Sequence, residues 1–288
     1  MLFRSRRSPV RLVEQPLTPT TFAFLRSLAA LRNGNFVSTT SSGLVEVPRN
    51  FDAGIIIPRV SAVTAAADFS DRLAAGSLVS IFGQNLASET RSSAAVPLPT
   101  QLGQVCVTVN AVRLPLLYVS PTQINAQLPF ELSGRLRAIL HTPGGLSDTF
   151  FAQVRTANPA VFQLSVSGQT GTFPAVVRVR NGQLSTLSNP LRRNEAFTVF
   201  ASGLGAVNPE VDNGDAAPAS PLAVTRQQPA VSIGGYSAGV LFSGLAPGFV
   251  GLWQLNAVVP ANAPVGMQIP LTISAGGLSV TVNVRIVD

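Results

Sequence analysis

Residues 123–129 read Gln-Ile-Asn-Ala-Gln-Leu-Pro, and residues 254–260 repeat them as Gln-Leu-Asn-Ala-Val-Val-Pro. Three further pairs of segments match in the same order: Phe82-Gly83-Gln84-Asn85-Leu86 with Phe200-Ala201-Ser202-Gly203-Leu204, Val107-Thr108-Val109-Asn110-Ala111 with Val231-Ser232-Ile233-Gly234-Gly235, and Gly144-Gly145-Leu146-Ser147 with Gly276-Gly277-Leu278-Ser279. Ordered matches at a long and nearly constant spacing indicate that one structural unit was duplicated. We therefore expect two similar domains along the chain.

The segments around these matches have the pattern of short β-strands. Residues 279–286 alternate apolar and polar side chains, which predicts a half-buried strand. Asn181-Gly182 lies between two alternating segments and predicts a hairpin. Many short strands separated by turns predict an all-β fold with two tandem immunoglobulin-like β-sandwiches. We place the first sandwich at residues 58–156 and the second at residues 157–288.

The segment that precedes the sandwiches differs in composition. Residues 1–32 are rich in Arg and contain a single acid, Glu14. We expect a basic head that is partly helical or disordered. Residues 33–57 hold two short alternating segments, 33–40 and 43–47, joined by a Ser-Gly turn, and predict a β-hairpin. The fold class is thus all-β, with a hairpin segment and a basic tail before the two sandwiches.

The charge distribution argues against nucleic acid as a partner. The net charge is +7, but residues 33–288 hold fourteen Arg and twelve acids and are nearly neutral. A face that neutralises several phosphates needs a local excess of basic side chains. The charged fraction of 11% is also far below the roughly 25% of typical globular proteins. A polar and weakly charged surface of this kind suits an extracellular or cell-surface protein.

Targeting and membrane signals are weak in this sequence. No apolar run reaches the roughly 18 residues of a membrane-spanning helix, so we expect no membrane span. The N-terminus has the Arg-rich flank of a signal peptide, but Arg26 interrupts its apolar stretch at residues 22–31. A poor signal, a short amphipathic helix and a mis-set gene start all remain open, and the chain has no clean signal peptide.

Residues suited to catalysis are few. His141 and Cys106 are the only residues of their types, so a Cys/His metal cluster is ruled out. His141 ends a predicted strand and Cys106 alternates with valines, and we interpret both as structural. Residues 210–215 carry several carboxylates, but they lack the full calcium-loop pattern and predict a solvated turn. Paired carboxylates that act across space remain open. We predict no catalytic residues, no metal, no cofactor and no enzyme activity.

One loop distinguishes the second copy from the first. The offset between the copies grows from 124 to 131 residues where the segment 245–253 replaces the shorter segment 120–122. This loop contains Phe249 and the only tryptophan, Trp253, and Tyr236 precedes it. Exposed aromatic rings stack on sugars or fill a partner's pocket, so we predict binding at Phe249, Trp253 and Tyr236. The alternative is that Trp253 is a core residue of the second sandwich.

Several long segments also resemble a known family. They are residues 75–86 (Ala-Gly-Ser-Leu-Val-Ser-Ile-Phe-Gly-Gln-Asn-Leu), 118–125 (Tyr-Val-Ser-Pro-Thr-Gln-Ile-Asn), 201–207 (Ala-Ser-Gly-Leu-Gly-Ala-Val) and 244–251 (Gly-Leu-Ala-Pro-Gly-Phe-Val-Gly). From about Arg59 to the end, the chain resembles the Solibacter-type uncharacterized C-terminal domain of acidobacteria. Its single units resemble immunoglobulin-like TIG/IPT domains. The resemblance implies the C-terminal part of an exported protein that often follows β-propeller repeats, with residues 33–57 as the remnant of a blade, and it implies no activity.

Together these observations predict a non-catalytic extracellular module, at the C-terminus of an exported protein, that serves as a spacer or adhesion element. Its partner would be a protein or a cell-surface polysaccharide. The alternative is a carbohydrate-binding module that uses the aromatic loop around Phe249 and Trp253.

Overall fold

The computed structural model describes residues 27–32, 36–40, 43–47, 56–168 and 170–288. These residues form strands and turns, and none of them lies in a helix, so the predicted all-β class is confirmed. The chain forms two compact units, one of residues 1–57 with 143–145 and one of residues 58–142 with 146–288.

The first unit contains a three-stranded antiparallel sheet of β1 (Ser27–Ala30), β2 (Phe36–Thr40) and β3 (Gly43–Val47). The predicted hairpin is present as β2 and β3. Residues 27–30 belong to the head that we expected to be partly helical or disordered, and the structure shows them as a strand. They pair with β2, for example Ala29 with Val37. A neighbouring strand supplies backbone partners that outweigh a weak local helix preference. Residues 1–26 lie outside the described residues.

The first repeat is built from two sheets around one core. One sheet has the order β4 (Arg59–Ala65), β5 (Leu78–Gln84), β10 (Gln123–Gln127), β9 (Leu116–Val119), β6 (Arg91–Ser92). The other has the order β12 (Gly145–Leu146), β11 (Gly134–Thr142), β7 (Cys106–Val109), β8 (Val112–Arg113), and β13 (Phe150–Val154) also pairs with β11. Inward residues of both sheets, such as Ile81, Val107 and Ile124, share one buried cluster.

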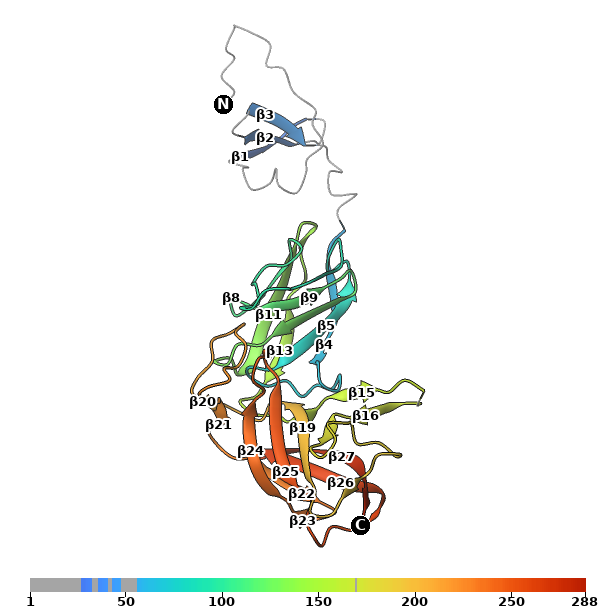
Figure 1. Cartoon of the computed structure of the whole chain (residues 1–288). Helices are drawn as coiled ribbons and strands as arrows, with labels where there is room; N and C mark the ends of the chain where they lie inside the picture. Colours follow the sequence, from blue (N-terminus) through green and yellow to red (C-terminus); the bar gives the residue numbers. More distant parts are fainter. Residues whose placement is uncertain (1–26, 33–35, 41–42, 48–55, 169) are drawn as a thin grey trace, which may run out of the picture. The chain divides into compact units, whose positions relative to one another are not determined.

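The second repeat has the same plan (Figure 1). One sheet has the order β14 (Ala160–Val161), β19 (Ala196–Ser202), β25 (Trp253–Val258), β24 (Gly239–Leu245), β21 (Val224–Thr225), β20 (Val207–Asn208), with β17 (Val176–Arg178) also on β19. The other has the order β18 (Leu191–Arg192), β27 (Leu278–Val287), β26 (Gly266–Ala275), β22 (Ala230–Ile233), β23 (Tyr236–Ser237). Its core includes Phe197, Trp253 and Ile273.

Strand pairing shows that the fold itself is duplicated. β10 lies between β5 and β9, and β25 lies between β19 and β24 in the same order. Both β9–β10 and β24–β25 carry an irregularity at the same place, after the pairs of Asn125 with Tyr118 and of Asn256 with Phe242. The predicted repeat is therefore a repeat of sheet topology. The domain boundaries at residues 58, 156 and 157 stay a prediction, because both repeats fall into one compact unit.

The copies differ at one edge strand. In the first repeat, β4 runs along β5 with a bulge between Val60 and Ala62. In the second, the corresponding edge is split into β14 and β17. Between them the chain forms an additional hairpin, β15 (Gln163–Ser165) and β16 (Thr172–Pro174), which projects from the side of the second repeat in Figure 1. The copies therefore diverge by an insertion at the position of the bulge.

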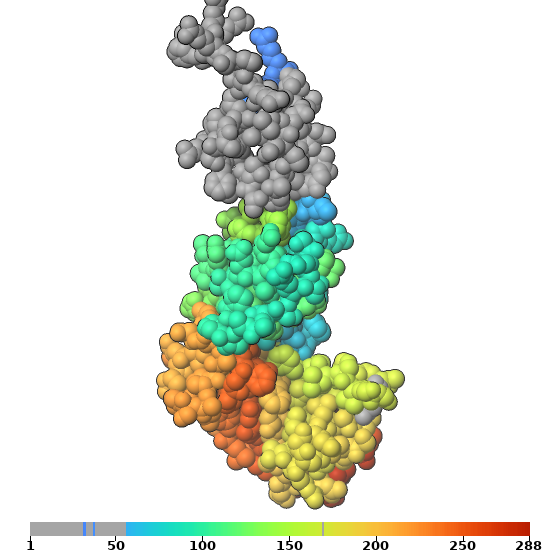
Figure 2. Space-filling model, turned by 45° about the horizontal axis from the view of Figure 1, so that its top comes forward, coloured from blue at the N-terminus to red at the C-terminus, as the bar shows by residue number. Residues whose placement is uncertain are grey.

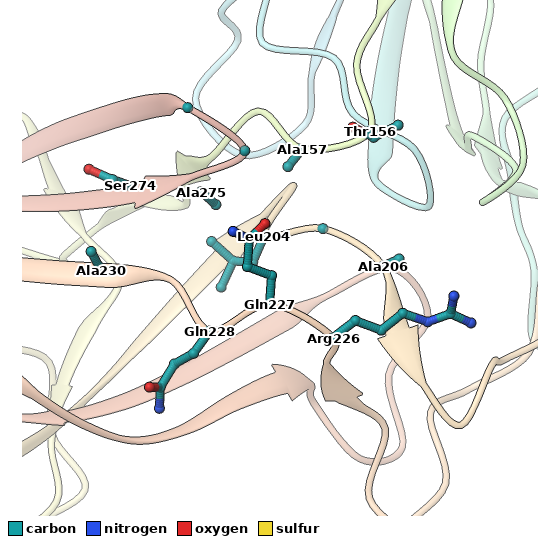
Figure 3. Close-up of a pocket in the computed structure, with 13 residues that line it drawn as sticks. Thr156, Ala157, Leu204, Ala206, Arg226, Gln227, Gln228, Ala230, Ser274 and Ala275 are labelled. Carbon is teal, nitrogen blue, oxygen red and sulfur yellow. The ribbon is translucent and has the colours of Figure 1, made fainter.

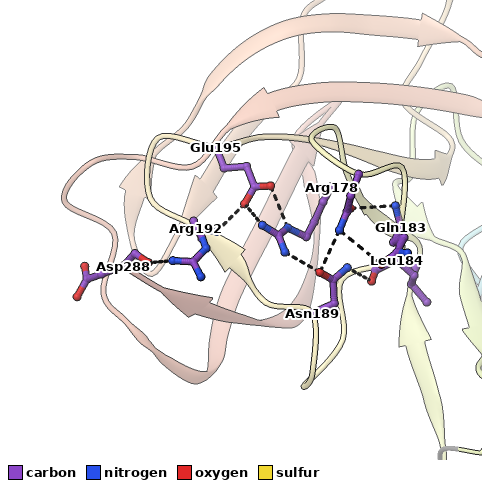
Figure 4. Close-up of polar contacts among 8 residues, drawn as sticks. Arg178, Gln183, Leu184, Asn189, Arg192, Glu195 and Asp288 are labelled. Carbon is purple, nitrogen blue, oxygen red and sulfur yellow. Dashed lines mark hydrogen bonds and ion pairs between the residues drawn. The ribbon is translucent and has the colours of Figure 1, made fainter.

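A buried ion pair fixes the loop that follows β17 (Figure 4). Arg178 is 8% exposed. Its guanidinium donates to both carboxylate oxygens of Glu195 at 2.9 and 3.0 Å and to Oδ1 of Asn189 at 2.6 Å. The Glu195 carboxylate also accepts from the backbone N–H of Arg192. These hydrogen bonds offset the free-energy cost of removing the two charges from water.

We predict that Glu195→Ala will lower the free energy of unfolding by about 3–5 kcal/mol, because Arg178 is then left charged and buried without its partner. Glu210 is the matched control: it pairs with Arg226, and its side chain is 82% exposed. Glu210→Ala should cost less than about 1 kcal/mol, since exposed pairs contribute little. Urea unfolding of the two variants measures both values, and equal losses would contradict the assignment.

Candidate functional site

The structure places Trp253 in the core, so its predicted role in binding is wrong and the core alternative is correct. Its side chain is 0% exposed. The indole Nε1 donates to the carbonyl oxygen of Gly205 at 3.3 Å, and the ring lies tilted against that of Phe130 with centroids 6.2 Å apart. Trp253 is an inward-facing residue of β25, where alternation directs every second side chain into the core.

Phe249 and Tyr236 are exposed but do not form one site. Phe249 is 58% exposed and Tyr236 is 45% exposed. Tyr236 lies on β23 just before β24, and Phe249 lies in the loop that follows β24. The seven residues of β24 span about 23 Å at the usual rise of a strand. Phe249 and Tyr236 are therefore at opposite ends of this strand.

The inserted loop at residues 246–252 is fixed by hydrogen bonds within the second repeat and packs against the first. The backbone N–H of Gly248 donates to the carbonyl of Ala217, and the N–H of Ala217 donates to the carbonyl of Phe249. Gly251 has a positive φ of 61°, and a Cβ at this position would lie 2.8 Å from the carbonyl oxygen of Gly76. Only glycine tolerates both the φ angle and this close approach to the first repeat.

Next to this loop lies an apolar groove of about 490 Å³. The first repeat contributes the segment 93–98 with Leu78 and Leu117, and the second contributes the inserted loop, the base of the inserted hairpin and Phe200. Three large side chains at the groove are well exposed: Val96 at 57%, Leu164 at 44% and Phe249 at 58%. None of the lining residues carries a formal charge. The inserted loop and the inserted hairpin of the second repeat thus line the same uncharged hollow, which we call the groove.

The groove depends on how the two repeats are held together. Gln127, which is 0% exposed, spans the boundary between them. Its Nε2 donates to the carbonyl oxygen of Gly76 at 3.1 Å, and its Oε1 accepts from the backbone N–H of Gly214 at 2.6 Å. The carbonyl oxygen of Gly214 in turn accepts from the N–H of Leu98, which lines the groove. We call these contacts of Gln127 and Gly214 the clasp.

The prediction of a solvated turn at residues 210–215 holds for Glu210 and Asp212, which are exposed, but not for the residues of the clasp. Gly214 is buried against the first repeat. Asn213 Oδ1 accepts from the backbone N–H of Phe130 at 3.0 Å, and its Nδ2 donates to the carboxylate of Glu131. The burial of Gly214 could not be predicted, because it depends on contacts with residues more than eighty positions away. Figure 2 shows the two repeats in direct contact, the first in green and the second in yellow to red.

The repeated motif places amides on the outer faces of both sheets. In β10, Ile124 and Ala126 are buried while Gln123 and Asn125 are partly exposed. Asn125 Oδ1 accepts from Ser80 Oγ at 3.1 Å and from Gln123 Nε2 at 2.8 Å. These three side chains and their equivalents Thr198, Gln254 and Asn256 form what we call the amide ladders.

The second ladder repeats the contacts of the first. Asn256 Oδ1 accepts from Thr198 Oγ1 at 2.9 Å and from Gln254 Nε2 at 3.1 Å. An aromatic residue faces each asparagine across the next strand pair, Tyr118 in the first repeat and Phe242 in the second. The motif therefore repeats outward-facing chemistry as well as core residues.

A second hollow of about 390 Å³ lies beside the connection between the repeats (Figure 3). Two of its polar side chains, those of Arg226 and Gln228, are bound within the protein. Arg226 donates to the carbonyl oxygen of Val207 and to Glu210, and Gln228 donates to the carbonyl oxygen of Val240. Ala157 packs so close to Gly276 that a Cβ there would lie 2.8 Å from the Ala157 methyl. Neither inserted segment of the second repeat lines this hollow, whereas both line the groove, and we therefore favour the groove.

His141 and Cys106 lie opposite each other on β11 and β7. Nε2 of His141 lies 2.9 Å from Thr108 Oγ1. Partial burial raises the pKa of the Cys106 thiol, and the nearby Arg113 opposes this shift. A raised pKa disfavours the thiolate that a nucleophile needs. Within the described residues no group of three or more His, Cys, Asp or Glu side chains could hold a metal ion.

Sequence reasoning found Phe249 but missed the other walls of the groove. Val96, Leu164 and Phe200 come from separate parts of the chain, and no local pattern connects them. The insertion that carries Leu164, between Val161 and Val176, becomes visible only through the pairing of β14 and β17 with β19, which the structure provides.

No family model matches the chain, and no curated protein matches it. The resemblance to the Solibacter-type domain and to TIG/IPT units therefore stays a prediction. No helix within the described part of the chain is long and apolar enough to cross a membrane.

Among solved structures, the chain is similar to SGBP-B from a complex xyloglucan utilization locus in Bacteroides uniformis (12% identity, 79% of this chain, 49% of that chain, TM-score 0.26). It is also similar to the Bacteroides ovatus mixed-linkage glucan utilization locus SGBP-B in complex with a mixed-linkage heptasaccharide (12% identity, 91% of this chain, 55% of that chain, TM-score 0.33). A third similar structure is the gamma-CGTase from Alkalophilic bacillus clarkii (13% identity, 91% of this chain, 30% of that chain, TM-score 0.26). The chain spans about half or less of these proteins, and at these scores the similarities carry no argument about its ligand.

We predict that Gln127→Val, which introduces the residue type of the equivalent position 258, will lower the free energy of unfolding by about 2–4 kcal/mol. The substitution leaves the N–H of Gly214 and the carbonyl of Gly76 without their partner. Gln228→Val is the control, since Gln228 is exposed and should change stability by less than about 0.5 kcal/mol. Urea unfolding of both variants measures the difference, and a Gln127 variant as stable as the control would disprove the clasp.

Proposed function

We propose that this chain is a non-catalytic binding module of the cell exterior, in which two joined immunoglobulin-like repeats hold a partner at the groove. The observation that carries the proposal is the convergence of both insertions on this groove. The duplicated core needs neither insertion, since the first repeat folds around the same plan without them. Loops and insertions on a rigid scaffold are where binding residues are most often found.

The chemistry of the groove supports binding over turnover. Hydrolysis requires a general acid, a base or a nucleophile in contact with the substrate. The side chains around the groove are aliphatic or aromatic, with the hydroxyl of Ser93 as the only polar side-chain group. An apolar hollow with exposed side chains such as Val96 and Phe249 is typical of a surface that binds a partner.

The clasp supports a role as a spacer or adhesion element. Gln127 and Asn213 fix the second repeat against the first through buried hydrogen bonds. Two repeats that cannot swing freely present their surfaces in one geometry, which lowers the entropy lost on binding. The low charge of the chain suits a position outside the cell, and the resemblance to exported acidobacterial proteins supports the same location.

A second candidate, carbohydrate binding, is favoured by the amide ladders. Their side chains are uncharged and accompanied by aromatic rings, and the four amides are partly exposed while Ser80 is buried. The original form of this hypothesis used Trp253 and Phe249. Because Trp253 is buried, the hypothesis now depends on Phe249 together with the ladders.

The test is a pull-down with heat-killed bacterial cells and with insoluble cellulose, xylan and chitin. We expect the wild-type protein to bind at least one of these materials, and the double variant Leu164→Asp with Phe249→Asp to bind at least tenfold more weakly. A partner that binds in the groove would bury the two introduced carboxylates, and the cost of removing them from water weakens binding. Met267→Asp is the control, because Met267 is 54% exposed and lies on β26, away from the groove.

Equal binding by the wild-type protein and the groove variant would overturn the proposal. So would release of soluble sugars or peptides by the wild-type protein, since that would make it an enzyme. Thermal unfolding of each variant shows whether the groove variant remains folded, which its exposed positions lead us to expect.

A further inference from the structure

We propose that the two amide ladders and the groove form one continuous track for an uncharged polysaccharide chain, with Asn125 and Asn256 as its two principal hydrogen-bond donors. This inference rests on the proposed binding function and names its ligand.

Duplication alone does not explain why the amides recur. The apolar residues of the motif are buried in both copies, Ile124 with Ala126 and Leu255 with Ala257, and packing accounts for them. Gln123 and Gln254 point to the other side of their strands, where the core places no demand on them. Their recurrence as a hydrogen-bonded set with Asn and a hydroxyl therefore calls for a reason outside the core.

Each ladder is fixed and leaves polar groups for a ligand. The Oδ1 of Asn125 accepts two hydrogen bonds from within the protein, which determines the orientation of its amide. Nδ2 of Asn125 and Oε1 of Gln123 have no hydrogen-bond partner among the described residues. The same atoms of Asn256 and Gln254 are left over in the second repeat. A donor beside an acceptor, held in place before binding, matches sugar hydroxyl groups, which both donate and accept.

Aromatic rings accompany both ladders in the same register. Tyr118 faces Asn125, and Phe242 faces Asn256. On the other side, Phe82 faces Gln123, and Phe200 faces Gln254. Aromatic faces stack on apolar surfaces, and the C–H face of a sugar ring is such a surface. Each ladder with its aromatic neighbours forms what we call a station, and none of the residues of a station is charged.

The two ladders approach the groove from opposite sides. Leu78 lines the groove and lies two residues before Ser80 on β5. Phe200 lines it and lies two residues after Thr198 on β19. Two residues of a strand span about 7 Å, so each ladder begins about 7 Å along its strand from the groove. Phe249 stands at this junction.

The position of the ladders favours a polysaccharide over a peptide strand. A peptide that extends a sheet binds to the free backbone groups of an edge strand. The ladders lie on β5, β10, β19 and β25, which are inner strands whose backbone groups already pair on both sides. Recognition here must use side chains, and two equivalent stations suit a polymer of repeating units. The absence of basic residues among them favours a neutral polymer over an anionic one.

The test is affinity electrophoresis and calorimetry of the full chain with three soluble neutral polysaccharides, a β-glucan, a xylan and a galactomannan, and with alginate as the anionic comparison. The informative variants are Asn125→Asp and Asn256→Asp. A carboxylate keeps both acceptor contacts inside the ladder, replaces the outward donor by an acceptor and adds a negative charge, so thermal unfolding of both variants is measured beside binding.

We expect the wild type to bind at least one neutral polysaccharide and to bind alginate more weakly. Each single variant should bind about tenfold more weakly, and the double variant more than a hundredfold, because two stations on one polymer reinforce each other. Asn262→Ala, an exposed residue outside the track, should bind like the wild type.

Three results would overturn the inference and leave the binding function standing. One is wild-type affinity in the double variant. Another is binding to cells, sensitive to Leu164→Asp with Phe249→Asp, together with no binding to any neutral polysaccharide. The third is equal binding of alginate and the neutral polymers. If the protein binds neither cells nor polysaccharides, both the inference and the proposed function fail.

Discussion

The buried amide of Gln127 is the contact on which the candidate site depends. It supplies a donor to Gly76 and an acceptor to Gly214, two backbone groups that burial would otherwise leave without partners. An unsatisfied buried polar group costs on the order of 1–3 kcal/mol, so the repeats cannot separate here without penalty. In the second copy the same position is Val258, which has no amide to make such contacts. One side chain thus turns two similar sandwiches into a single frame.

A comparison of the two copies distinguishes residues that form the cores from residues that line the candidate site. Shared features such as the inward alternation of β10 and β25 explain the cores. Features of the second copy alone, the β15–β16 hairpin and the loop with Phe249, build the walls of the groove. The amide ladders belong to a third category. Both copies share them although neither core needs them, so we assign them to recognition.

Local patterns were enough to predict the all-β class, the repeat, and individual strands such as β5, β19 and β27. They were not enough where the outcome depended on distant partners. The β15–β16 hairpin, the strand β1 and the burial of Gly214 all arise from pairing or packing with residues elsewhere in the chain. Trp253 shows the same limit, because its sequence position allowed both a loop ring and a core ring. Phe249 was correctly predicted to be exposed, but its neighbours in the groove could not be predicted, because they come from distant parts of the sequence.

The pairing of β18 with β27 has a mechanical consequence. β27 is held along its length by β26 on one side, and β18 runs parallel to it near residue 288 on the other. Arg193 adds an ion pair to the side chain of Asp288. Tension applied at residue 288 along the axis of β27 would load many backbone hydrogen bonds at once, instead of opening them one after another. The second repeat is therefore built to transmit force through this strand to its core before the strand can peel away.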